Sequence, residues 1–237
     1  NGKKNPFSLS FGRIPPEYIV RSNVIERVVE TFMNDPVTVQ NYIITGVRGS
    51  GKTVTMTAIC DRFKETPNWH VIKISPLDDI LKVLLKQLQT ICGYLHITKS
   101  VFNIGIPSLL NISVEKDASV ELDINTQIDS LLEKLSNKNQ NILVSIDEIT
   151  DTTQMRKFSS ALQMFITNNR PIYFIGTGLF EEIDKLKNIP NLTFLYRTPK
   201  LQMTPLNIIA MAQAYQRSFK ISEGQAHTMA NMTKGYS

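Results

Sequence analysis

Apolar positions along the chain follow two alternating patterns. Five short runs of β-favouring residues are typical of buried strands, at 41–45, 70–75, 142–146, 172–176 and 200–204. Between them, apolar residues recur every three or four positions, which predicts amphipathic helices over 52–63, 75–91, 126–135, 152–167 and 179–186. Because helices separate the strands, the sequence predicts an α/β fold of three layers around a parallel five-stranded sheet.

Three further regions give predictions about helix boundaries, an insertion and the C-terminal part. Ser75-Pro76 is typical of a helix start, with Ser75 as the N-cap and two aspartates in the first turn. Alternating runs around Pro107 predict a β-ribbon inserted at about 93–124. From Asn207 onward the pattern is helical. We therefore expect a core domain over 1–204 and a C-terminal helical part over 205–237.

Composition narrows the class of protein. With 42% hydrophobic and 20% charged residues over 237 positions, the chain matches an average soluble domain. It has no signal-peptide pattern and no apolar run of the ~20 residues that a membrane span needs, so we expect a cytoplasmic protein. We interpret the start at Asn1, without a methionine, as a fragment boundary.

Zinc binding and cysteine redox chemistry find no support in the sequence. The two cysteines, Cys60 and Cys92, lack C-x-x-C spacing and lie in predicted helices, which fits a reduced compartment. The histidines at 70, 96 and 227 are isolated, without metal-ligand spacing. We expect neither a zinc site nor a disulfide.

Positive charge gathers at the C-terminal end. Residues 185–237 hold one of the 21 acidic side chains, Glu223, and seven of the 26 basic ones, a local balance of +6 against −1 for the remainder. Such a stretch could meet nucleic acid, an acidic partner or the nucleotide itself, or it could be a solvated face. The basic residues are Lys185, Lys187, Arg197, Lys200, Arg217, Lys220 and Lys234.

The stretch GVRGSGKT lies between a predicted strand and a predicted helix. It fits G-x-x-x-x-G-K-[ST], a loop whose backbone N–H groups wrap phosphates while the lysine and the hydroxyl reach onward. Strand, glycine loop and helix are the context that this motif needs. The predicted nucleotide-binding residues are Gly46, Val47, Arg48, Gly49, Ser50, Gly51, Lys52, Thr53 and Val54.

Polar residues follow two later strands. Asp147 and Glu148 end the apolar run ILVSI, and Thr177 ends IYFIG. An acidic pair at a strand end is often only a solvated loop. Together with a phosphate loop, however, Asp147 is expected to orient Mg²⁺ through its water shell and Glu148 to polarise an attacking water. Thr177 could touch the γ-phosphate or its water, or it could be a helix cap or turn former.

The motifs GVRGSGKT, ILVSIDEI and GTG, with NPFSLSFGRIPPEYIVRSNVIERVVETF before them, resemble the AAA+ superfamily of ATPases. The resemblance covers about Asn5 to Ser237 and is strongest to origin-recognition and replication-initiator ATPases with their bacterial and mobile-element relatives. It implies a P-loop sheet of order 5-1-4-3-2 followed by a helical lid. Here the lid ends abruptly at TKGYS, so we expect it to be truncated.

The resemblance also implies roles for single residues. Lys52 would hold the β- and γ-phosphates, Thr53 and Asp147 the metal, and Glu148 the nucleophilic water. Thr177 matches the first sensor, and Arg197 is the best match to an arginine that reaches into a neighbouring subunit, although a surface arginine is the alternative. No residue matches the second-sensor arginine. The adenine pocket maps to Pro15, Pro16, Tyr18, Ile19, Val20 and Arg21.

Three functions are compatible with these motifs. The first is Mg²⁺-dependent ATP binding and hydrolysis to ADP, coupled to motion of the lid or of subunits in a homo-oligomer, with DNA as a candidate partner of the basic C-terminal part. The second is a slow nucleotide-gated switch or scaffold that recruits a protein. The third, a small-molecule kinase, is disfavoured by the Asp147-Glu148 pair and the strand pattern.

Overall fold

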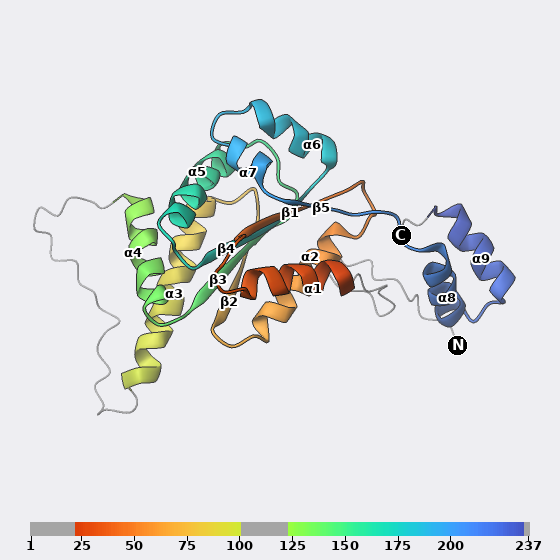
Figure 1. Ribbon diagram of the computed structural model, residues 1–237, viewed down its shortest axis with the longest axis horizontal. Helices are drawn as coiled ribbons and strands as arrows, with labels where there is room; N and C mark the ends of the chain where they lie inside the picture. The colour runs from red at the N-terminus through yellow and green to blue at the C-terminus, as the bar shows by residue number, and fades with distance from the viewer. Residues whose placement is uncertain (1–21, 101–122, 235–237) are drawn as a thin grey trace, which may run out of the picture.

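A computed structural model describes residues 22–100 and 123–234. Its centre is a parallel sheet of order β2-β3-β4-β1-β5, which confirms the predicted three-layer α/β architecture and strand order (Figure 1). The strands are β1 (Asn41–Thr45), β2 (Trp69–Ile74), β3 (Asn141–Ile146), β4 (Ile172–Gly178) and β5 (Lys200–Gln202).

The three central strands end at nearly the same level. Ile146 of β3 pairs with Gly176 of β4, and Thr45 of β1 pairs with Gly178. All seven residues of β4 are buried, as expected for a central strand of a sheet covered on both faces. Consequently the segments that follow β1, β3 and β4 meet at one edge, the carboxyl edge of the sheet.

Helices cover both faces of the sheet (Figure 1). On one face, α1 and α2 pack against an aromatic cluster that includes Phe32, Phe63 and Tyr173. On the other face the core is mainly aliphatic, with Leu84, Ile128 and other fully buried side chains. The helices of the core are α1 (Ser22–Met33), α2 (Lys52–Lys64), α3 (Ile80–Ser100), α4 (Ile124–Ser136), α5 (Thr153–Thr167), α6 (Phe180–Lys185) and α7 (Thr193–Arg197), with a 3-10 turn at Leu186–Asn188.

Two predictions about α3 are wrong. The helix begins at Ile80, not at Pro76, because Asp79 accepts the first hydrogen bonds, from the backbone N–H groups of Lys82 and Val83. Residues 75–79 form a turn that leaves Leu77 89% exposed. At its other end α3 continues through residues 93–100, where the β-ribbon was expected to start. The rest of the predicted ribbon, residues 101–122, lies outside the described residues.

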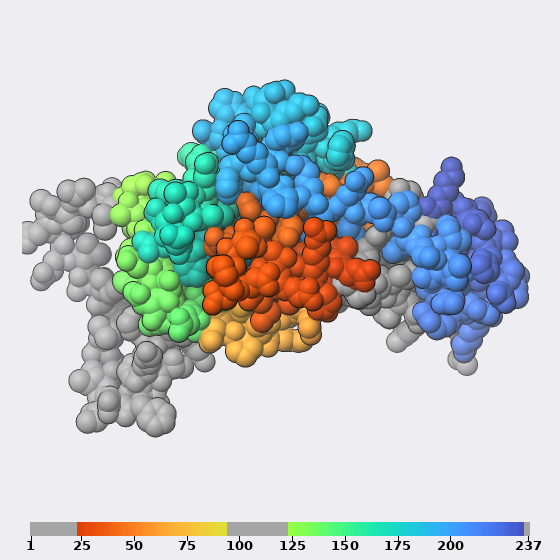
Figure 2. Space-filling view, in the orientation of Figure 1, coloured from red at the N-terminus to blue at the C-terminus, as the bar shows by residue number. Residues whose placement is uncertain are grey.

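The C-terminal helices form a separate hydrophobic cluster. α8 (Ile208–Phe219) and α9 (Glu223–Met232) pack on each other through residues that include Met211 and Ala230. Asn207 caps α8, and Ser222 with Gln225 forms a capping box on α9. Figure 2 shows this pair at one end of the molecule, and Figure 1 shows that it lies beyond the sheet. Within the described ranges, no helix is long and apolar enough to cross a membrane.

An ion pair joins α4 to the start of β4. Arg170 donates to both carboxylate oxygens of Asp129, at 2.9 and 2.7 Å, and the two side chains are 18% and 20% exposed. This guanidinium holds the pKa of Asp129 below its usual value. Because the folded pKa is lowered, the stabilisation is complete above the ordinary aspartate pKa and is lost as pH falls through the folded value.

We therefore expect Asp129→Asn to lower the free energy of unfolding at neutral pH by about 1–2 kcal/mol. Urea unfolding of variant and parent from neutral pH downward measures this, and the two should converge in acid. Asp151→Asn, which removes the more exposed Arg156–Asp151 pair, is the control and should cost less. Equal losses at every pH would contradict the assignment.

Candidate nucleotide site at the carboxyl edge of the sheet

The glycine loop runs from the end of β1 to the start of α2, as predicted. Gly49 and Gly51 have φ angles of 75° and 83°, a left-handed conformation in which a side chain is strained. Gly46 is required for a different reason: a Cβ there would lie 2.7 Å from Ser50 Oγ and 3.0 Å from Met203 Cβ. The sequence thus folds into an open loop at a helix N-terminus, where backbone N–H groups favour anions.

Lys52 is turned back onto this loop. Its ammonium group donates to the carbonyl oxygens of Gly46 and Val47, at 3.0 and 2.8 Å. Partial burial lowers the pKa of Lys52, while the nearby carboxylates of Asp147 and Glu148 act in the opposite direction. A charged donor satisfied by weak neutral acceptors can exchange them for phosphate oxygens, which bind it more strongly.

Thr53 and Asp147 connect the loop to the end of β3. The Thr53 hydroxyl lies 3.2 Å from Oδ1 and 3.0 Å from Oδ2 of Asp147. A hydroxyl and a carboxylate at this separation are hard oxygen donors of the kind that Mg²⁺ takes together with phosphates and waters. The pair fits the predicted metal site. No cluster of three or more histidine, cysteine or acidic side chains suited to a metal occurs in 22–100 or 123–234.

Thr177 lies on the other side of Asp147 and is fully buried. Its hydroxyl donates to Oδ1 of Asp147 and accepts the backbone N–H of Glu148 at 2.9 Å. One side chain therefore holds both acidic residues. The hydroxyl thus takes part in the turn that carries the acids, and the predicted contact with the γ-phosphate or its water stays a prediction.

Glu148 has a backbone conformation that the sequence did not predict. Its φ is 57°, which is uncommon for a residue with a side chain. The bond from its N–H to Thr177 fixes this turn, while the side chain is exposed at the same edge as the glycine loop. The strained backbone thus directs the carboxylate away from the core.

Sequence reasoning missed Ile149. Its N–H donates to the carbonyl of Thr177 at 2.7 Å, and its side chain covers Gly176, where an added Cβ would lie 2.3 Å from Ile149 Cδ1. A Cβ on Gly178 would similarly meet Ile183 at 2.5 Å. The glycines on either side of Thr177 were the available signal, since they permit this close packing.

Arg197 is predicted as a site residue but does not lie at this site in its own chain. Arg197 is exposed at the end of α7, and the next residue, Thr198, accepts a hydrogen bond from Asn41 at the start of β1. The length of β1 therefore separates Arg197 from the loop of its own chain by roughly 13 Å or more. The predicted adenine pocket, with Pro16, Tyr18, Ile19 and Arg21, lies outside the described residues.

Part of the positive charge of the basic C-terminal stretch, residues 185–237, is balanced by acidic side chains that precede it in sequence. Lys185 and Lys187 pair with Glu182 and Asp184 at 2.6 and 2.7 Å, and both acids precede the stretch. Lys200 lies 4.5 Å from the centre of the Tyr196 ring. The described cations on the α8–α9 pair and its end are Arg217, Lys220 and Lys234.

Comparison with solved structures identifies the fold. Cdc6p from Pyrobaculum aerophilum matches with a TM-score of 0.59 and 14% identity, over 95% of this chain and 57% of that one. ORC2 of Aeropyrum pernix, in ADPNP–ADP complexes, gives 0.58 and 13%, over 94% and 59%. Drosophila ORC bound to DNA gives 0.57 and 15%, over 92% and 56%.

The chain has the fold of these proteins. It spans less than two thirds of the length of each of these structures. No protein-family model and no curated protein sequence matches it.

The position of Thr177 leads to a prediction about the acidic turn. Thr177→Val should lower the free energy of unfolding by about 1–3 kcal/mol, because it leaves the Glu148 N–H without its acceptor and removes one of the two hydroxyl donors to the half-buried Asp147 carboxylate. Exchange of the Glu148 amide hydrogen should accelerate. Thr177→Ser, which keeps the hydroxyl, is the matched control. If the valine variant protects that amide as well as the parent does, Thr177 does not hold the turn.

Proposed function

We propose that the chain is an AAA+ ATPase of the initiator type, which binds ATP with Mg²⁺ and hydrolyses it to ADP and phosphate. One observation carries the proposal: Lys52, Thr53, Asp147, Glu148 and Thr177 lie at one edge of the sheet, in a fold shared with the nucleotide-bound ORC2 structure. Shape alone would support nucleotide binding only as an analogy. The arrangement of these side chains adds the parts that hydrolysis requires.

Each residue has a distinct part in this proposal. The loop amides and Lys52 would bind the phosphates and neutralise their charge. Thr53 and Asp147 would hold Mg²⁺, which would stabilise charge on the transferring phosphoryl group. Glu148 takes a proton from the water that attacks the γ-phosphorus, and the bond to the β-phosphate oxygen breaks to leave ADP. Thr177 keeps the two acids in place.

The nucleotide state would be transmitted through the chain segment after β5. Met203 donates its N–H to Thr45 and approaches Gly46, so this segment touches the start of the glycine loop before it leads to α8. Loss of the γ-phosphate would change the loop and thereby the position of the α8–α9 pair. A slow switch that recruits a protein partner is the alternative function for the same residues. The rate of ATP hydrolysis distinguishes the two functions.

Hydrolysis assays test the central proposal. We expect the parent to release phosphate in the presence of Mg²⁺ and Glu148→Gln to be slower by at least about 10²-fold while still binding ATP. Lys52→Ala should weaken ATP binding by at least about tenfold. Glu30→Gln, an exposed acid on α1, is the matched control and should behave as the parent. A Glu148→Gln variant with parental turnover would refute the assignment, and a parent that binds without turnover would favour the switch.

We further propose that Arg197 completes the site of a neighbouring copy, because it is exposed and remote from its own loop. Arg197→Ala and Lys52→Ala should each hydrolyse ATP at least about tenfold more slowly than the parent. A mixture of the two should recover activity, since one supplies the intact loop and the other the arginine. Full activity of Arg197→Ala alone, or no recovery on mixing, would exclude this role.

DNA binding is a second proposed function, supported by the fold shared with Drosophila ORC bound to DNA and by the cations near α8 and α9. Stimulation of hydrolysis by duplex DNA that weakens as salt rises would support it. Stimulation independent of salt, or none, would argue against an electrostatic contact through this region.

A further inference from the structure

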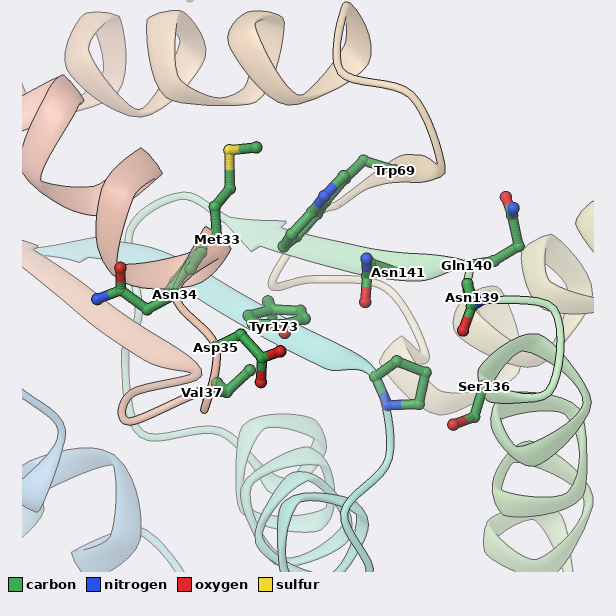
Figure 3. Close-up of a pocket in the computed structure, with 12 residues that line it drawn as sticks. Met33, Asn34, Asp35, Val37, Trp69, Ser136, Asn139, Gln140, Asn141 and Tyr173 are labelled. Atoms are coloured by element: carbon green, nitrogen blue, oxygen red, sulfur yellow. The ribbon is translucent and has the colours of Figure 1, made fainter.

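A hollow of about 590 Å³ opens at the amino edge of the sheet, opposite the glycine loop (Figure 3). It lies between the end of α1 with the turn after it, and the segments that lead into β3 and β4. This volume is in the range of small-ligand sites. The proposed ATPase chemistry makes no use of this hollow, so what it binds is a separate question.

Two largely buried aromatic residues line the hollow, and each has a polar atom that lacks a hydrogen-bond partner in the described part of the chain. Tyr173 is 4% exposed, burial raises its pKa, and its hydroxyl forms no hydrogen bond with the described part of the chain. Trp69 is 9% exposed, and its indole N–H is likewise unpaired within 22–100 and 123–234. Neither polar atom is sealed from solvent, so a ligand in the hollow can reach both. A ligand with both donors and acceptors would satisfy them.

The charge of the hollow selects the kind of ligand. Asp35 is its charged lining residue and forms no ion pair with any residue of the described ranges, in a protein of net charge +5. In Figure 3 the polar ends of Asp35 and Asn141 lie around Tyr173, with Met33 and Val37 on the same side as Asp35. Met33 and Val37, which also line the hollow, are 53% and 43% exposed and give it accessible apolar surface.

We propose that this hollow binds an arginine side chain carried by a peptide segment of a partner protein. The guanidinium donates to the Asp35 carboxylate and to the Asn141 amide oxygen, and the Tyr173 hydroxyl oxygen accepts a further N–H. The methylene groups pack on Met33 and Val37, and a peptide carbonyl accepts the Trp69 N–H. Arginine fits better than lysine because its planar guanidinium offers five donors at fixed angles.

Trp69 provides the readout, because it is the single tryptophan of the chain. The full chain is titrated with the blocked peptide acetyl-Gly-Arg-Gly-amide, and tryptophan emission is followed. We expect a saturable change for this peptide and at least about tenfold weaker binding of the peptide that has citrulline, an uncharged shape analogue, in place of arginine. Asp35→Asn should weaken arginine-peptide binding by a similar factor.

Two controls separate this site from the nucleotide site and from misfolding. Lys52→Ala should bind the arginine peptide as the parent does, so a failure of the ATPase proposal leaves this one standing. Asp35 is exposed, and its asparagine variant should unfold at the parental urea concentration. The proposal is overturned if emission shows no saturable change, if citrulline binds equally well, or if Asp35→Asn binds as the parent does.

Discussion

The carboxylate of Asp147 accepts hydrogen bonds from two threonines, and the rest of the site depends on this interaction. Thr53 approaches it from the first turn of α2 and Thr177 from the end of β4. Three segments that are remote in sequence are thereby fixed to one another at the carboxyl edge of the sheet. The Asp147 side chain is half-buried where these segments meet.

This interaction requires a close fit of the surrounding backbone. Ile149 covers Gly176, and its N–H binds the carbonyl of Thr177, so the chain after β3 is held against the tip of β4. Glu148, between them, takes a left-handed conformation that directs its side chain outward. The strained backbone conformation thus occurs at the residue whose carboxylate is exposed at this edge. Strained residues are common at functional sites.

Most of the fold could be predicted from the sequence, as could the meeting of the glycine loop with Asp147, Glu148 and Thr177 at one sheet edge, because buried strands and amphipathic helices leave local patterns. The glycine loop and the Asp147-Glu148 pair had recognisable flanks for the same reason. The start of α3 could not be predicted, because Ser75-Pro76 and Asp79 both supply helix-start signals and only packing decides between them. The contact of Ile149 with Gly176 and the hollow near Asp35 join residues distant in sequence, and no local pattern encodes them.

Amide chemical shifts measured during titration with Mg²⁺ and a non-hydrolysable ATP analogue test the central claim most directly. The account predicts saturable shifts in three separate segments, 46–53, 147–149 and 176–178, with the last two responding because Asp147 and Thr177 connect them to the loop. Shifts confined to 46–53 would contradict the proposed coupling. Saturable shifts at the opposite edge of the sheet alone, or none at all, would contradict the nucleotide site itself.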